Sequence, residues 1–316
     1  MVSTIGLVSV IVLLLIGFFL FKEAFQIFYR EGVLKIIFGK AWYPTYDPPS
    51  FGMFPLIMGT VAVTFLTAVM AIPLGLATAV YIAEVANYRV KEFLKPFIEM
   101  LASFPSVVLG FFGMVVIAPI LSNWLSPLVA DKLPELLQGT NIPFLSTTLA
   151  DFCQDKLFIA SGLNITTAAL MLTVRAIPVI ASIAEDALTA VPRTYREASY
   201  SLGADKWETI WKVVIPASVS GLSVAVILGI GTIIGETMIV LMVAGGAAVV
   251  PHWMFDAARP MPAAIAAEMA EAPYQSFHYS ALFGVGAILF IITFILGLIS
   301  DFIAKKYRMV RIGEKV

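Results

Sequence analysis

Charged residues are scarce in this chain. Asp, Glu, Lys and Arg make up only 13% of its 316 residues, whereas soluble domains carry about 25%. A soluble core could not enclose the rest, since 60% of the residues are hydrophobic and the mean hydropathy is +0.94. The net charge of −1 argues against nucleic acid as a partner. The composition therefore predicts a protein embedded in membrane lipid.

The residues of common catalytic sites are also missing. Cys153 is the only cysteine and the histidines are two, so the sequence offers neither an intrachain disulfide nor a zinc cluster. The P-loop pattern and the H-E-x-x-H and G-x-S-x-G patterns are absent. Residues 229–235 superficially resemble a dinucleotide loop, but the spacing is wrong, and we interpret Gly231 and Gly235 as positions of close helix packing. We therefore expect a protein that is not an enzyme and holds no cofactor or metal of its own.

Six apolar stretches are long enough to cross a bilayer, which takes about 20 residues each. They lie near 4–21, 54–84, 96–123, 158–186, 213–245 and 278–304. Pro73, Pro105 and Pro178 lie inside spans and are expected to kink them. The first stretch could instead be a cleaved signal peptide; because no Lys or Arg precedes it, we expect a retained anchor. The sequence thus predicts an all-α polytopic membrane protein with six transmembrane helices.

Basic residues are unevenly divided between the two sides of these spans. One side holds both termini, with residues 1–3, 85–95, 187–212 and 305–316, and its 52 residues contain 12 Lys or Arg. The other side holds 22–53, 124–157 and 246–277, and its 98 residues contain 7. Because the basic side of membrane proteins faces the cytoplasm, we expect both termini there.

The basic segment 187–212 predicts two short helices. Arg193 to Leu202 can form the first, and Gly203 is a natural helix stop. Asp205 can cap a second helix, with Glu208 completing a capping box. An alternative is an interfacial loop anchored by tryptophans at the headgroup level.

The spacing within this segment resembles a motif of ABC importer permeases. Glu197-Ala198-Ser199, three residues, Gly203, nine residues and Val213-x-Ile215-Pro216 resemble E-A-A, three residues, G, nine residues, I-x-L-P. Ser199 replaces the third-position alanine. The resemblance implies that Glu197, Ala198, Ser199 and Gly203 form the coupling helix, which seats in a cleft of the ATPase subunit.

Further motifs resemble PstC-type phosphate permeases, in the same order. They are Gly59-Thr60, Pro73-Leu74-Gly75, Ala79 to Glu84, Phe104 to Gly110, Gly235-Glu236-Thr237-Met238, Ile265 to Glu268 and His278 to Phe283. The resemblance implies a type I ABC importer permease fold of the MetI-like kind. It divides the chain into an anchor span and outer segment (1–53), a permease core (54–304, with coupling helices at 187–212 and an outer insertion at 124–157) and a basic cytoplasmic tail (305–316).

Glu236 is a carboxylate inside an apolar span. Placing such a charge at the centre of a membrane helix costs about 2.5–3.5 kcal/mol, which marks the residue as a functional candidate. Phosphate at neutral pH still carries a proton that a carboxylate can accept, whereas sulfate does not. Our hypothesis is that Glu236 selects protonated oxyanions; the alternative is a partnered or protonated Glu236 that fixes helix packing. Thr237 and Ser106 lie in the same family motifs and join it as candidates for the substrate pathway.

One position departs from the family pattern. Thr232 stands where the family usually has an arginine, four residues before the glutamate. Arg175, inside the fourth span, could have taken over attraction of the anion. Alternatively, Arg175 forms a structural ion pair with Glu99, Glu236 or a partner subunit.

The resemblance implies the partners and the location. They are a second, PstA-like permease subunit, two PstB-like ATPase subunits that bind ATP-Mg, and a PstS-like extracytoplasmic phosphate-binding protein, in a bacterial or archaeal cytoplasmic membrane. The alternatives are a permease for another oxyanion, an ion-coupled secondary transporter and, with least support, an intramembrane enzyme.

Overall fold

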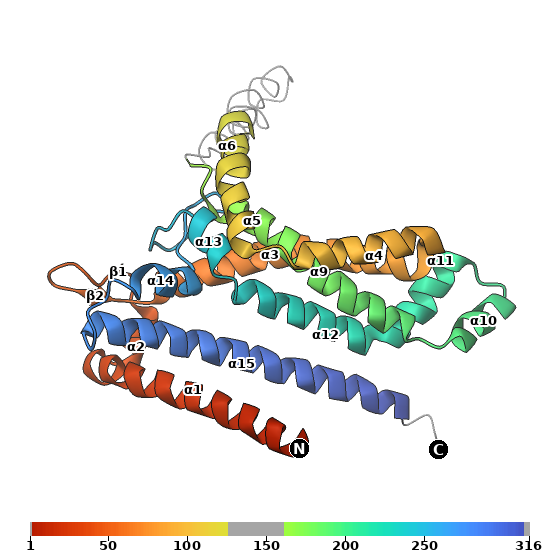
Figure 1. The fold of residues 1–316 in the computed structure, drawn as a ribbon, viewed down its shortest axis with the longest axis horizontal. Coiled ribbons are helices and arrows are strands. Elements are labelled where there is room, and N and C mark those ends of the chain that lie inside the picture. Colours follow the sequence, from red (N-terminus) through yellow and green to blue (C-terminus); the bar gives the residue numbers. More distant parts are fainter. Residues whose placement is uncertain (1, 126–160, 313–316) are drawn as a thin grey trace, which may run out of the picture. The chain divides into compact units, whose positions relative to one another are not determined.

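The structure, a computed structural model, describes residues 2–125 and 161–312, and these are predominantly helical (Figure 1). Within the described residues, six helices are long and apolar enough to cross a membrane, as the sequence predicts. They span Gly6–Glu31, Phe54–Val85, Ser106–Asn123, Ile165–Thr189, Lys206–Ile234 and Phe277–Ser300.

The bounds of the elements follow the chain. The described α-helices are α1 (Val2–Glu31), α2 (Val33–Phe38), α3 (Phe54–Val80), α4 (Tyr88–Ala102), α5 (Ser106–Phe112), α6 (Ala118–Ile120), α9 (Ile165–Thr189), α10 (Arg193–Ser201), α11 (Lys206–Thr209), α12 (Ile215–Ile234), α13 (Met238–Val243), α14 (Met261–Glu268) and α15 (Phe277–Ile312). The π-helical turns are η1 (Tyr81–Val85), η2 (Gly113–Ile117), η3 (Leu121–Leu125) and η5 (Ile210–Val214), and the strands are β1 (Trp42–Tyr43) and β2 (Ser50–Phe51).

Two of the six spans begin or end differently from the sequence prediction. The third starts at Ser106 rather than near residue 96, because α4 stops at Ala102 and Pro105 disfavours helical backbone at Phe104. The fifth runs continuously from Lys206 to Ile234 and stops at Gly235, instead of extending to residue 245. A separate helix, α13, begins after this break. Both breaks fall in segments that the sequence singled out for function.

By its internal contacts the chain divides into two compact units, which are described separately. The first comprises Met1–Leu66, Val107–Ala169 and Glu236–Ile292. Its core includes Ile27, Trp42, Met53, Met261 and Leu282. Here α1 lies along the first half of α15, and the rings of Phe19 and Phe283 meet edge to face at 5.7 Å (Figure 1). In the short hairpin, β1 pairs antiparallel with β2, and Trp42 lies opposite Phe51.

The second unit comprises Thr67–Ser106, Leu170–Gly235 and Thr293–Val316. Small residues bring its helices together: a Cβ on Gly75 would lie 2.8 Å from the Ile180 side chain, and a Cβ on Gly229 would also collide with it. Close packing was expected at Gly231, but a Cβ there would have no heavy atom within 4 Å, and Gly235 faces only the Gly231 carbonyl. The packing glycine of α12 is therefore Gly229, because that residue faces α9.

The predicted division into anchor, core and tail remains a prediction. The predicted outer insertion at 124–157 lies, apart from its first two residues, outside the described residues. In the predicted tail, α15 continues as an unbroken helix to Ile312.

Candidate functional site

The segment that resembles the coupling motif forms the predicted pair of helices. α10 ends at Ser201, and Gly203 has a φ of +84°, a left-handed conformation that glycine adopts without strain. Asp205 then caps α11: its carboxylate accepts a hydrogen bond from the Glu208 backbone N–H at 2.7 Å, and the Glu208 carboxylate accepts one from the Asp205 N–H at 3.3 Å. The predicted helix, glycine turn and capping box are confirmed.

A buried pair of hydroxyls joins the two helices. Ser199 is 8% exposed, Thr209 is 1% exposed, and their oxygens lie 2.9 Å apart. Ser199 replaces the alanine of the family motif, and the hydroxyl that it adds contacts Thr209. Sequence reasoning missed Thr209, because nothing in its local pattern shows that it faces α10.

Other side chains of the helical pair are exposed. Glu197 and Ala198 are exposed on α10, and Leu202, at the turn, is 89% exposed. Trp207 and Trp211 are 57% and 65% exposed. Exposed apolar groups beside charged ones are typical of a protein-binding surface. We call Glu197, Ala198, Leu202, Trp207 and Trp211 the coupling surface.

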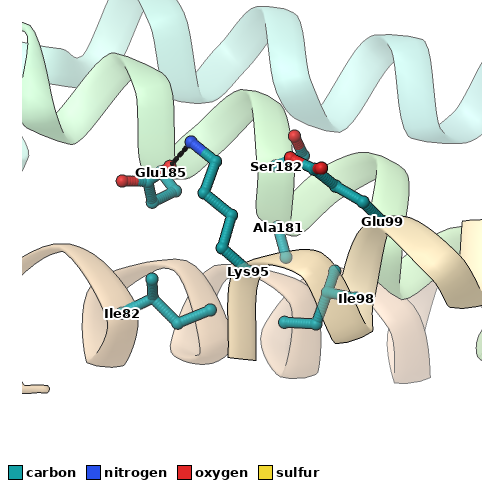
Figure 2. Close-up of a pocket in the computed structure, with 7 residues that line it drawn as sticks. All are labelled: Ile82, Lys95, Ile98, Glu99, Ala181, Ser182 and Glu185. Carbon is teal, nitrogen blue, oxygen red and sulfur yellow. Dashed lines mark hydrogen bonds and ion pairs between the residues drawn. The ribbon is translucent and has the colours of Figure 1, made fainter. Parts of the chain in front are cut away.

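A buried carboxylate lies near this pair of helices, on α9. Glu185 is 3% exposed and accepts hydrogen bonds at 2.6 Å from both Lys91 and Lys95 of α4, and at 3.0 Å from the Thr189 hydroxyl (Figure 2). The hydrogen bond to Glu185 raises the pKa of Lys95 above its ordinary value. Sequence reasoning did not find this cluster, which fixes α4 against α9.

Arg175, the cation in the fourth span, contacts backbone rather than a carboxylate in its recorded hydrogen bonds. Its Nη1 donates to the carbonyl oxygens of Ala102 at 3.1 Å and Phe104 at 3.2 Å. These carbonyls flank the break between α4 and α5, where helical hydrogen bonding is interrupted. Ser106, the first residue of α5, follows directly and is half-buried. The structure therefore brings Arg175 to the segment that precedes Ser106.

Thr232, at the position of the missing arginine, is satisfied within its own helix. Its hydroxyl donates to the Leu228 carbonyl oxygen at 3.0 Å, a common local bond of threonine in membrane helices. Thr232 is half-buried and lies one turn before the end of α12.

Glu236 lies in the break between α12 and α13. Its Oε1 accepts a hydrogen bond from the Met238 backbone N–H at 3.2 Å, and its side chain is half-buried. Thr237 occupies the N-cap position of α13 without a capping bond from its side chain. Nearby, α13 packs closely on α5, since a Cβ on Gly110 would lie 2.8 Å from the Met242 sulfur. The carboxylate is thus held by a helix break that exposes backbone donors, rather than by an unbroken span.

The pathway candidates fall into two groups. Arg175, Thr232 and Ser106 belong to the second compact unit, whereas Glu236 and Thr237 belong to the first. Within the second unit, Arg175 and the segment before Ser106 meet.

A further polar cluster surrounds Glu268 at the end of α14. Its carboxylate accepts hydrogen bonds from the Trp42 indole at 3.1 Å and from Arg259 at 2.5 Å, and lies 2.9 Å from the His278 ring. Glu268 and His278 both belong to motifs that carry the family resemblance. The cluster ties β1, α14 and the start of α15 together.

Comparisons with known proteins place the sequence in context. Residues 71–309 match the family of binding-protein-dependent transport system inner membrane components. The probable ABC transporter permease protein YqgH of Bacillus subtilis (strain 168) is 32% identical over 310 residues, which cover 98% of this chain and 90% of that protein. The phosphate transport system permease protein PstC of Pasteurella multocida (strain Pm70) is 32% identical over 258 residues, covering 81% of this chain and 76% of that protein.

Solved structures share the fold. A chain of the methionine ABC transporter MetNI in an inward-facing conformation superposes with a TM-score of 0.54 at 21% identity, covering 82% of this chain and 99% of that chain. A chain of a bacterial alginate ABC transporter, solved in complex with a periplasmic protein bound to an alginate pentasaccharide, gives 0.55 at 14% identity, covering 96% and 94%. At such identities the likeness shows the fold alone, and it confirms the predicted architecture.

Proposed function

The chain belongs to the family of binding-protein-dependent transport system inner membrane components, and we propose that the cargo it translocates is inorganic phosphate. It is the multi-pass permease subunit of an ABC importer in the inner membrane, a transport subunit rather than an enzyme. Family membership sets aside the ion-coupled secondary transporter and the intramembrane enzyme.

Similarity to PstC proteins is the observation that carries the phosphate proposal. Besides the Pasteurella protein, PstC of Mesorhizobium japonicum is 30% identical over 316 residues, 99% of this chain. The B. subtilis relative, by contrast, has a name that states no cargo. Phosphate is therefore the best-supported cargo.

Glu236 supplies the chemistry that would select phosphate. Its Oε1 already accepts one N–H from Met238, and carboxylate oxygens have room for further donors. Protonated phosphate can donate to it, whereas sulfate at neutral pH has no proton and is repelled. Sites built around one such hydrogen bond reject analogues that cannot make it by about 10,000-fold.

Arg175 and Thr232 shape the second candidate, a permease for another oxyanion. Thr232 places a neutral hydroxyl where the family has a cation, and that hydroxyl is bonded to Leu228. Arg175 is the cation left to attract the anion, with Nη1 held at the α4–α5 break. Ser106 and Thr237 offer hydroxyls beside the two breaks.

The remaining partners follow from the family. A second, PstA-like permease completes the pathway, and two PstB-like ATPase subunits with ATP-Mg bind the coupling surface. A PstS-like binding protein delivers phosphate from outside, and both termini lie in the cytoplasm. This chain itself binds no cofactor. Closure of the ATPases on ATP would move the helical pair and open the pathway by alternating access.

Uptake by the reconstituted complex tests the cargo. We expect ATP-dependent uptake of labelled phosphate, competition by arsenate, which is protonated like phosphate, and no competition by sulfate. Glu236→Gln should reduce phosphate uptake by about 10- to 100-fold, because it removes one acceptor from a desolvated site. Glu271→Gln, at an exposed carboxylate, is the matched control. Sulfate uptake without phosphate uptake would refute the proposal.

A further inference from the structure

We propose that Arg196 is a positioning residue that ties the coupling helix α10 to the ends of α3 and α9, so that these helices move with α10 as one body. The inference rests on the proposed function in one respect: an ATPase pushes on the coupling surface. It concerns how that push enters the spans, and not which cargo crosses.

Arg196 makes contacts to two other helices. Its Nη2 lies 2.5 Å from Oε1 of Glu84 in η1, the turn that ends α3, and its Nε donates to Oε2 of the same carboxylate at 3.4 Å. Its Nη1 donates to the Val191 carbonyl oxygen at 2.6 Å, and Nη2 donates to that of Leu188 at 3.0 Å. One planar guanidinium therefore joins α10 to α3 and to the end of α9.

The burial of this contact distinguishes it from an ordinary surface ion pair. The Arg196 side chain is 17% exposed and that of Glu84 is 9% exposed. Exposed pairs contribute about 0–1 kcal/mol and readily separate. A buried pair resists separation, because either charge left alone loses its partner without regaining water. The arginine also lies at the carbonyl end of α9, where a cation is favourable.

The Glu185 cluster extends the same block to α4. Glu185 lies one turn before Leu188 on α9 and holds Lys91 and Lys95 of α4 (Figure 2). We call Glu84, Lys91, Lys95, Glu185 and Arg196 the helix clamp. Through it α3, α4, α9 and α10 are joined by charged hydrogen bonds, which are stronger than neutral ones.

α10 has a second link, which makes the role of Arg196 separable. The Ser199–Thr209 hydroxyl pair joins α10 to α11, and the helix that begins at α11 continues into the fifth span. Loss of Arg196 would therefore leave α10 attached to the fifth span while freeing it from α3 and α9. A purely structural role would loosen the whole region instead.

A distance measurement tests the clamp without reference to cargo. Spin labels are placed at Tyr81→Cys on η1 and Ser201→Cys on α10, two exposed positions, in a Cys153→Ser background. The intact complex with its ATPase is measured nucleotide-free and trapped with ATP and vanadate. We expect the same distance in both states. In Arg196→Gln and in Glu84→Gln, we expect the distance to shift or broaden by several ångströms on trapping.

Matched variants make the outcome decisive. Arg89→Gln, at an exposed arginine of α4, should behave like the unmodified complex. The double variant Arg196→Gln/Glu84→Gln should be no worse than either single variant, because all three remove one link. Arg196→Lys keeps the charge but cannot hold all of these acceptors, and should be intermediate if Arg196→Gln is too unstable to assemble.

Transport per ATP hydrolysed provides the second readout. In the single variants it should fall at least about tenfold while ATPase co-purification is retained. An unchanged distance in Arg196→Gln on trapping, or a nucleotide-dependent shift in the unmodified pair, would overturn the clamp. Absence of phosphate uptake by the unmodified complex would refute the proposed cargo alone, since the distances decide the clamp independently.

Discussion

Ser199→Ala restores the family residue at the third position of the coupling motif, yet we expect it to destabilise this protein. The Thr209 hydroxyl is 1% exposed and lies 2.9 Å from that of Ser199. Removing Ser199 Oγ leaves a buried hydroxyl without that partner, which costs about 1–3 kcal/mol. Thr209→Val alone should cost about 1 kcal/mol, because it strands the Ser199 hydroxyl in the same way.

The double variant Ser199→Ala/Thr209→Val makes this prediction specific. It removes both hydroxyls and keeps nearly the same volume, so no polar group is stranded, and the loss should be less than about 1 kcal/mol. The two sites should therefore show a coupling energy of about 1 kcal/mol or more. Ser201→Ala is the control: its exposed hydroxyl donates to the Glu197 carbonyl, and the change should stay within about 0.5 kcal/mol.

Hydrogen exchange of the α11 backbone amides is the appropriate assay, because it reports local opening free energies of this pair rather than global unfolding. The single variants should exchange faster by about 5- to 150-fold, and the double variant should return close to the unmodified rate. If the single effects simply add in the double variant, the hydroxyl pair does not hold the two helices together.

Two further predictions concern the coupling surface and the fourth span. Leu202→Asp places a charge at a side chain that is 89% exposed, and should weaken ATPase co-purification by about 30-fold, as for an interface hot spot, without lowering expression of the permease; undiminished co-purification would exclude Leu202 from the interface. Arg175→Gln should slow phosphate uptake by at least about tenfold by loosening the α4–α5 break, with little change in KM; a rise in KM instead would show that Arg175 attracts the anion.

Composition and local pattern were sufficient to predict the spans and the coupling helices. Both depend on neighbours in the chain: apolar length in the first case, and in the second a glycine at positive φ followed by a capping box. The ends of the third and fifth spans were wrong because hydropathy does not register a break. Pro105 and Gly235 interrupt the helix while the surrounding residues remain apolar.

Contacts between distant residues could not be predicted in this way. Arg196 and Glu84 are separated by 112 positions, and neither local pattern indicates the other. The recorded partners of Arg175 are backbone carbonyls, which every residue has, so the sequence suggested carboxylates instead. Likewise Gly231 has the spacing of a packing glycine, but the face of α12 that meets Ile180 carries Gly229.

The coupling helices and Glu236 are connected along the chain by a single stiff element. The fifth span is one continuous helix from Lys206 to Ile234, 29 residues or about 44 Å long. Its first residues belong to the helical pair that Ser199 and Thr209 hold together, and its first interruption is at Gly235. A helix transmits displacement along its axis because its backbone hydrogen bonds are continuous, so a push on the pair is first absorbed where those bonds stop. Glu236 lies at that point, with one carboxylate oxygen on the Met238 N–H, where a change in backbone geometry alters what the carboxylate can bind.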